Sequence, residues 1–281
     1  MGAAKNNPTT VTAFGRGRFS PDLIRAWEAD RCAAFAVAIE RLRGWPVHAS
    51  LIGDEVMRLQ AEDATDWVYD PRGIYTAARF GNAIIMPLTK SRAEWPPSAF
   101  ERPGFLRSRA ECIGEEGLAA LGVSVDEGQI DAAIAQIEAN RAYLAFIPER
   151  PYPRFPALAL KRYSWRHCVV FADALARITG LPPMIMRASQ VSNAYAAAKD
   201  HIHAVVQHPD GTVEDVWGRQ SQEAVARRYA MLRWTLSEET HHTAMEEAHR
   251  VRPEVANEVA EADAVIRQYR VDAAGPPASA R

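Results

Sequence analysis

The sequence predicts an α+β protein of two related units, each a cysteine-bearing helix packed on a small antiparallel sheet, with extra helices. Two segments that begin at Arg31 and His167 repeat one another. Each is followed by short stretches in which apolar and polar residues alternate, as they do in half-buried strands. Longer stretches with helical periodicity close each copy. Self-similarity of this kind indicates an internal duplication.

The repeat is clearest in the helical segments 31–46 (RCAAFAVAIERLRGWP) and 167–182 (HCVVFADALARITGLP). They align without gaps and are identical at seven of sixteen positions. The identical pairs are Cys32 with Cys168, Phe35 with Phe171, Ala36 with Ala172, Ala38 with Ala174, Arg41 with Arg177, Gly44 with Gly180 and Pro46 with Pro182. In the second copy the apolar positions form one helical stripe. Glycine followed by proline is typical of a helix end.

A second block places Asp70 on Asp215 and Gly73 on Gly218. The offset between the copies grows from 136 residues at the cysteines to 145 at the aspartates, so the second copy has about nine more residues between them. We expect strands between the two blocks, the last pair in the second copy joined by the turn PDG. The expected strands are 47–53, 55–62 and 66–70 in the first copy, and 183–189, 201–208 and 212–217 in the second.

The remaining segments complete the domain organisation. Helical patterns cover 124–146, 222–234, 237–250 and 253–269, and the proline-rich segment 147–160 is expected to be an extended connector. We predict a mobile arm at 1–18, a first unit at 19–150, a second unit at 151–270 and a disordered tail at 271–281.

Composition excludes several classes of protein. The chain has 281 residues, 48% hydrophobic and 24% charged, with a net charge of −2 and scattered basic residues, so we expect no nucleic-acid partner. No window of 18 apolar residues predicts a membrane span, and the N-terminus lacks the apolar region of a secretory signal. The three distant cysteines favour a reducing, cytoplasmic setting, with export without a classical signal left open.

The second copy contains a candidate catalytic set, Cys168, His203 and Asp215, in that chain order. The cysteine opens a helix, whose N-terminal partial charge stabilises a thiolate. A neighbouring imidazole takes the thiol proton, and a carboxylate orients that imidazole. Backbone N–H groups at the helix start are candidate donors to an oxyanion.

The stretches HCVVFADALARITGLPP and HIHAVVQHPDGTVEDVWG resemble bacterial members of the papain-like cysteine peptidase and transglutaminase-like superfamily. In that fold the nucleophile opens the central helix, and the histidine and the acid come from the sheet. The resemblance implies Cys168 as nucleophile, His203 as general base and Asp215 as orienting acid. The family's Gln or Asn helper before the cysteine has no match, because Trp165, Arg166 and His167 occupy that approach.

The resemblance implies a thiol-dependent amide hydrolase or acyltransferase, of peptidase, deamidase or transglutaminase type, acting on a protein or peptide. No cofactor and no metal are expected, and the oligomeric state stays open. The competing hypothesis is a non-catalytic binding or adaptor protein that keeps the fold. In the first copy the position twelve residues before Asp70 holds Arg58, which is always charged and is no base. We therefore expect that copy to be degenerate and Cys32 to be a core residue.

Several alternatives remain open in the sequence. Cys168 lies on its helix's apolar stripe and would also suit a core. His201 lies two residues from His203 and is a second candidate base; the two histidines with Cys168 would also suit zinc. His242 and Glu246 are spaced to bind a metal ion but are better explained as a solvated helix face. His208, beside the turn, is expected to be exposed. Cys112 is expected to be structural or incidental.

Overall fold

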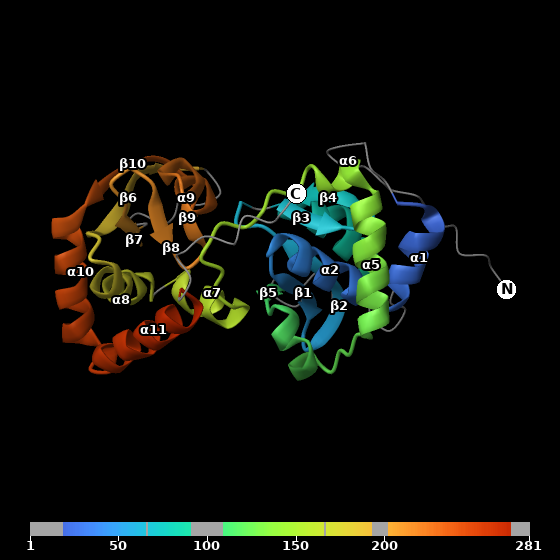
Figure 1. The fold of residues 1–281 in the computed structure, drawn as a ribbon, viewed down its shortest axis with the longest axis horizontal. Helices are drawn as coiled ribbons and strands as arrows, with labels where there is room; N and C mark the ends of the chain where they lie inside the picture. Colours follow the sequence, from blue (N-terminus) through green and yellow to red (C-terminus); the bar gives the residue numbers. More distant parts are fainter. Residues whose placement is uncertain (1–18, 66, 91–108, 166, 193–201, 271–281) are drawn as a thin grey trace, which may run out of the picture. The chain divides into compact units, whose positions relative to one another are not determined.

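The computed structural model describes residues 19–65, 67–90, 109–165, 167–192 and 202–270 (Figure 1). The chain divides into two compact units, one ending at Glu149 and the other beginning at Arg150. Each unit combines helices with one five-stranded antiparallel sheet, so the protein is α+β. The predicted arm 1–18 and tail 271–281 lie outside the described residues.

The first unit has a sheet with the strand order β4-β3-β2-β1-β5. Its longer elements are α1 (Pro21–Ala29), α2 (Ala33–Arg43), β1 (Val47–Ile52), β2 (Glu55–Glu62), β3 (Trp67–Asp70), β4 (Gly73–Thr76), α3 (Ala77–Phe80), α4 (Met86–Lys90), β5 (Arg109–Cys112), α5 (Glu127–Ala139) and α6 (Arg141–Leu144). A π-helical turn, η1 (Gly81–Ile85), joins α3 to α4, and two 3₁₀ turns, η3 (Glu115–Gly117) and η4 (Ala119–Leu121), follow β5.

The second unit has a sheet with the strand order β10-β6-β7-β8-β9. Its elements are α7 (Ala157–Tyr163), α8 (Cys168–Thr179), β6 (Pro183–Val191), β7 (Ile202–Gln207), β8 (Val213–Asp215), β9 (Gly218–Gln220), α9 (Gln222–Arg228), β10 (Met231–Ser237), α10 (Glu238–Val251) and α11 (Val255–Tyr269). The three strands expected in each copy are present within one or two residues at most ends.

The two sheets have the same topology. In each unit a helix is followed by four strands, each paired with the next, and a fifth strand pairs with the free edge of the first. α2 therefore corresponds to α8, β1–β4 to β6–β9, and β5 to β10. All these pairings are antiparallel. The repeat in the sequence thus has a counterpart in the order of the elements.

Glycine ends both of the repeated helices, as predicted. Gly44 and Gly180 have φ of 78° and 70°, and the amide of each donates to the carbonyl four residues earlier. This left-handed conformation is strained for residues with a Cβ atom and is common just past the end of a helix. The helices therefore stop before the first strands of the sheets begin.

Small and apolar residues bury the two helices against their sheets. Every α2 residue from Ala33 to Ile39 is buried, and α8 buries residues 168–172 with Ala174 and Leu175. Alanine allows the helix backbone to approach the sheet closely, and α8 contacts β6 and β7 directly (Figure 1). The start of α8 is thereby held over the strand that carries His203.

Two expectations about secondary structure are wrong. The predicted helix 222–234 ends at Arg228, and β10 follows after Ala230, which has a φ of 54°. Pairing of β10 with β6 outweighs the local helical pattern, because strand preference depends on tertiary context. The connector 147–160 is not extended throughout either, since α7 begins at Ala157 and buries part of its apolar surface.

Among the described residues, no helix has both the length and the apolar content needed to cross a membrane.

Candidate active site

Cys168 is the first residue of α8, directly after the N-cap residue His167. Its side chain is nearly enclosed, with 6% of the residue exposed. The first amides of a helix have no acceptor within the helix and give its N-terminus a partial positive charge. The thiol interacts with the imidazole of His203 and with the backbone amides of Val169 and Ala204. Cys168 therefore lies in surroundings that favour a thiolate.

His203 and Asp215 form a buried hydrogen-bonded pair. The imidazole Nε2 on β7 lies 2.9 Å from the carboxylate Oδ2 at the end of β8, and both side chains are at most 2% exposed. A carboxylate only accepts, so Nε2 carries the hydrogen. The other ring nitrogen, Nδ1, is buried and makes no hydrogen bond of regular geometry with the described residues. Nδ1 is thus the ring nitrogen that has no hydrogen and is able to accept a proton.

Three further donors hold the Asp215 carboxylate. The Trp217 amide donates to Oδ1 at 2.8 Å, Gln220 Nε2 donates to Oδ1 at 3.2 Å, and Arg228 Nη1 donates to Oδ2 at 3.0 Å. Arg228 also donates to Gln220 Oε1 at 2.6 Å. The carboxylate is therefore fixed at both oxygens, and His203 shares Oδ2 with a cation.

The turn after Asp215 requires glycine at position 218. Gly218 has a φ of 101°, and a Cβ atom built there would lie 2.6 Å from the carbonyl oxygen of Pro151. This close approach lets the chain pass from Asp215 in β8 to Gln220 at the end of β9. The conserved spacing between aspartate and glycine in both copies reflects this turn, since Asp70 likewise pairs with Gly73.

Aromatic side chains fix the imidazole ring of His203. The Tyr229 ring stacks on it, with centroids 3.9 Å apart and planes at 26°. Tyr229 is held in turn by its hydroxyl, which donates to the Ser164 carbonyl at 3.0 Å. Trp165, half exposed, packs edge-on against Tyr229 at 5.2 Å. The imidazole is therefore held by stacking on one side and by the carboxylate at Nε2.

Charge interactions shift the pKa values of all three residues in the direction that favours an ion pair. Burial raises the pKa of Cys168, but the hydrogen bond and charge of His203 outweigh it and lower the pKa below its ordinary value. Burial lowers the pKa of His203, yet Asp215 and the Cys168 thiolate raise it overall. Burial raises the pKa of Asp215, but Arg228 and His203 hold it below its usual range.

The first unit has a different set at the corresponding positions. Cys32 is fully buried and is the N-cap of α2, with a left-handed φ of 66°. Arg58 on β2 donates from Nε to Asp70 Oδ2 at 2.6 Å and from Nη2 to Asp70 Oδ1 at 3.1 Å. Arg58 also donates to Glu28 at 3.0 Å. A fixed cation thus stands where the second unit has the imidazole of His203.

The thiol of Cys32 is also electrostatically disfavoured as an anion. Burial raises its pKa well above the ordinary value; the positive charge of Arg58 opposes this, and the negative charges of Asp70 and Glu28 add to it. The identity of Cys32 and Cys168 in sequence therefore does not extend to their chemistry.

The structure also places the other residues named from the sequence. His201 lies outside the described residues. His208 is not exposed as expected, because its Nε2 lies 2.9 Å from Glu214 and its side chain is 9% exposed. His242 and Glu246 are exposed on α10. Within the described part of the chain, no three His, Cys, Asp or Glu side chains are grouped to hold a metal ion.

Sequence reasoning missed Gln220, Arg228 and Tyr229. Arg228 and Tyr229 fall in the segment 222–234, whose pattern predicts one continuous helix. The end of α9 instead directs Arg228 toward Asp215. No spacing rule links these residues to His203, because their proximity depends on the pairing of β6, β7 and β10.

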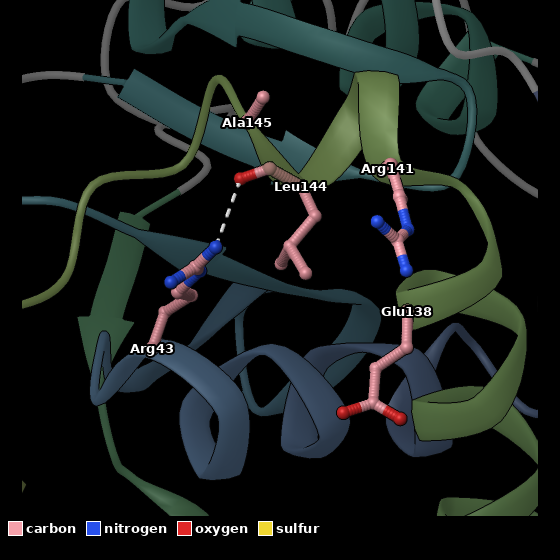
Figure 2. A pocket seen from close by; sticks show the side chains of 5 residues that line it. All are labelled: Arg43, Glu138, Arg141, Leu144 and Ala145. Carbon is pink, nitrogen blue, oxygen red and sulfur yellow. Dashed lines mark hydrogen bonds between the residues drawn. The ribbon is translucent and has the colours of Figure 1, made fainter. Parts of the chain in front are cut away.

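A separate hollow lies in the first unit (Figure 2). It has a volume of about 540 Å³ and is lined by Arg43, Glu138, Arg141, Leu144 and Ala145. Arg43 closes one side by donating to the Leu144 carbonyl at 3.3 Å. Its lining contains no nucleophile or imidazole, so we place the candidate active site at Cys168.

Comparisons of the chain with protein-family models, with curated proteins and with solved structures found no significant match. The geometry of the second unit is therefore what indicates a function for this protein.

Proposed function

We propose that the protein is a thiol-dependent amide hydrolase or acyltransferase, with a papain-like or transglutaminase-like second unit and a degenerate first unit of common origin. The observation that carries this proposal is the buried chain of contacts from the thiol of Cys168 through His203 to Asp215, with Nε2 2.9 Å from Oδ2. The shared topology of the two sheets and the pairing of Arg58 with Asp70 support the common origin.

In the proposed reaction, the proton of the Cys168 thiol moves to His203 Nδ1. The thiolate sulfur forms a bond to the carbonyl carbon of an amide, and the carbonyl electron pair moves onto oxygen. Collapse of this intermediate breaks the carbon–nitrogen bond, and the amine leaves with the proton from His203. Water or a second amine then gives its proton to the imidazole and forms a bond to the thioester carbon. The carbon–sulfur bond breaks, the acid or new amide is released, and the sulfur leaves as a thiolate beside the imidazolium, which restores the starting pair.

Each positioning contact has a defined part in this scheme. Asp215 holds the Nε2 proton and so keeps Nδ1 free as the base. Gln220 and the Trp217 amide hold Asp215. The amides at the start of α8 are the candidate donors to the oxyanion.

A direct test is to trap the acyl-enzyme. The full chain is incubated with a library of blocked peptide amides and a biotin-labelled primary amine, followed by mass spectrometry of the protein and the peptides. We expect an acyl group on Cys168, with either the free acid or the biotinylated amide as product. Cys168→Ser removes both, whereas Cys32→Ser keeps them. The absence of both a product and an adduct with every peptide tested would contradict the proposal.

The second candidate function is a non-catalytic binding protein. The observation in its favour is the near-complete enclosure of Cys168, of which 6% is exposed. A binding protein would recognise a peptide equally well with Cys168→Ala and would form no covalent adduct. Equal peptide affinity of both forms in calorimetry, with no adduct, would support this candidate.

A further inference from the structure

One sheet face differs in character between the two units. On this face Ser50 pairs with Arg58 in the first unit, and Met186 pairs with His203 at the corresponding register in the second. Met186 belongs to an apolar cluster, whereas the first unit has polar side chains here. The buried ones are His48, Ser50, Arg58 and Gln60. Buried polar groups cost free energy unless they are hydrogen-bonded, so their presence calls for a reason.

Some of the polar side chains on this face are hydrogen-bonded to one another. Ser50 Oγ and Gln60 exchange hydrogen bonds at 3.0 and 3.2 Å, and Gln60 Nε2 donates to Glu62 at 2.7 Å. These contacts hold the Glu62 carboxylate near His48. The negative charge of Glu62 raises the pKa of the His48 imidazole. Beyond this network lies Cys112, which was expected to be structural or incidental.

His48 and Cys112 are direct register partners on the antiparallel strands β1 and β5, so their side chains leave the same face. The thiol of Cys112 and the imidazole of His48 are therefore cross-strand neighbours, in a kind of pair whose Cβ atoms lie about 4.5–5.5 Å apart. His48 Nδ1 lies 3.1 Å from the carbonyl oxygen of Pro46, which only accepts, so Nδ1 carries the hydrogen. Nε2 is then the nitrogen that accepts the thiol proton.

The surroundings also favour a charged imidazole. Burial lowers the pKa of His48, but the negative charge of Glu62, the neighbouring Cys112 and the Pro46 carbonyl raise it to about 10. Cys112 is half-buried and lies on β5, an edge strand, so its sulfur is not sealed in a core. A partly accessible thiol beside a cation is the environment of a reactive cysteine.

The neighbouring backbone argues against acyl transfer at this thiol. The amides of Ile113 and Gly114 both donate to the Val47 carbonyl, at 2.9 and 3.0 Å. They are therefore not available to an oxyanion, and Cys112 lies in a strand rather than at a helix start. Thiol–disulfide exchange needs no oxyanion donor, only a thiolate and access to its sulfur.

We propose that Cys112, with His48 as its proton acceptor, is a second reactive thiol at which the protein forms a mixed disulfide with low-molecular-weight disulfides. The proton of the thiol moves to Nε2, and the thiolate attacks one sulfur of the disulfide. A new sulfur–sulfur bond forms as the old one breaks, and the leaving thiolate takes the proton from the imidazolium. A free thiol reverses the step. The site lies in the first unit and does not depend on the chemistry of Cys168.

The test uses the full chain in a Cys168→Ala background, so that the candidate catalytic thiol contributes nothing. The protein is incubated with oxidised glutathione near neutral pH, and mixed disulfides are located by residue-resolved mass spectrometry over time. The same reaction is followed in the urea-unfolded protein. His48→Gln removes the base, and His242→Gln, the same substitution at an exposed histidine of α10, is the matched control.

We expect Cys112 to be modified faster in the folded than in the unfolded protein, with Cys32 unmodified. His48→Gln should slow modification of Cys112 about a hundredfold, the lower end of the effect of losing a general base. His242→Gln should leave the rate within a factor of about two, since an exposed side chain of α10 takes no part in this sheet. If Cys112 of the folded Cys168→Ala protein reacts no faster than Cys112 of the unfolded protein, the proposal is overturned. This comparison does not depend on the folding of the His48→Gln variant. An unchanged rate in folded His48→Gln would overturn the proposal as well.

Discussion

Arg58 in the first unit occupies the place of His203 in the second. Arg58 Nε lies 2.6 Å from Asp70 Oδ2, and His203 Nε2 lies 2.9 Å from Asp215 Oδ2. In both units the aspartate also accepts the amide two residues on, at 2.8 Å. The same frame thus holds a fixed cation in one copy and a titratable base in the other.

Removing one partner of the ion pair of Arg58 and Asp70 should lower the free energy of unfolding more than replacing both partners together. Both side chains are at most 3% exposed. Arg58→Met leaves Asp70 as a buried, uncompensated charge, which costs about 3–5 kcal/mol of unfolding free energy. The double variant Arg58→Met with Asp70→Asn should recover much of that loss. Urea unfolding of the four proteins of this cycle checks it, and additive losses would contradict the expectation.

The effect of the Asp215 charge on His203 can be tested separately from the effect of their hydrogen bond. Asp215→Asn keeps an acceptor for Nε2 but removes the charge that raises the pKa of His203, so that pKa falls. Less of the thiolate–imidazolium pair then exists at neutral pH, by about tenfold for each pKa unit lost. Asp215→Ala also frees the ring to turn. NMR titration of the imidazole gives the pKa, and no change in Asp215→Asn would contradict the assigned role.

Arg228 tempers the effect of Asp215 on the imidazole. Its charge is the largest opposing influence to burial on the pKa of Asp215, and it shares Oδ2 with His203. Arg228→Met removes the positive charge that partly neutralises Asp215. The carboxylate then stabilises the imidazolium form of His203 more strongly, so the pKa of His203 rises. Arg228→Lys is the matched control, because it keeps the charge but loses the fork to Gln220. The same NMR titration should show a larger upward shift for Met than for Lys; equal shifts would assign the effect to geometry alone.

Glu40 should make the first unit less stable as pH rises. Burial on α2 raises its pKa to about 7 from 4.5, although Val47 and Glu115 amides donate to Oε2 at 3.0 and 2.8 Å. Between these pH values the folded state holds a proton that the unfolded state has lost, so unfolding free energy falls as pH rises. The change is at most about 3 kcal/mol.

Glu40→Gln stays neutral and accepts the same amides, so it should be more stable than the native protein at pH 8 and equal to it near pH 4. Glu138→Gln, at an exposed position on α5, is the control. Urea unfolding as a function of pH measures the difference. A difference between native protein and Glu40→Gln that does not vary with pH would contradict the assignment.

Local patterns predicted the frame of the fold. The repeat, the terminating glycines and the alternating strands located α2, α8 and most of the strands, because these depend on residues close together in the chain. The twelve-residue spacing from Arg58 to Asp70 identified the pair that the structure joins. These features need no knowledge of which strands are neighbours.

The rest depends on long-range pairing. Residues 222–234 have a helical pattern, yet β10 forms there because β6 offers an edge. Arg228 and Tyr229 meet Asp215 and His203 only as a result. His48 meets Cys112 through the register of β1 and β5, which nothing in their sequence neighbourhood indicates.

We propose that Cys168 and His203 form a thiolate–imidazolium pair, and the reactivity of the thiol reports on it. The direct measurement is the pH dependence of iodoacetamide labelling, located by residue with mass spectrometry, in the native protein and in His203→Ala. We expect fast labelling of Cys168 near neutral pH, slowed by His203→Ala, with Cys32 protected in both proteins. Labelling of Cys168 only after denaturation would contradict the proposed pair and would favour a binding protein with a core cysteine.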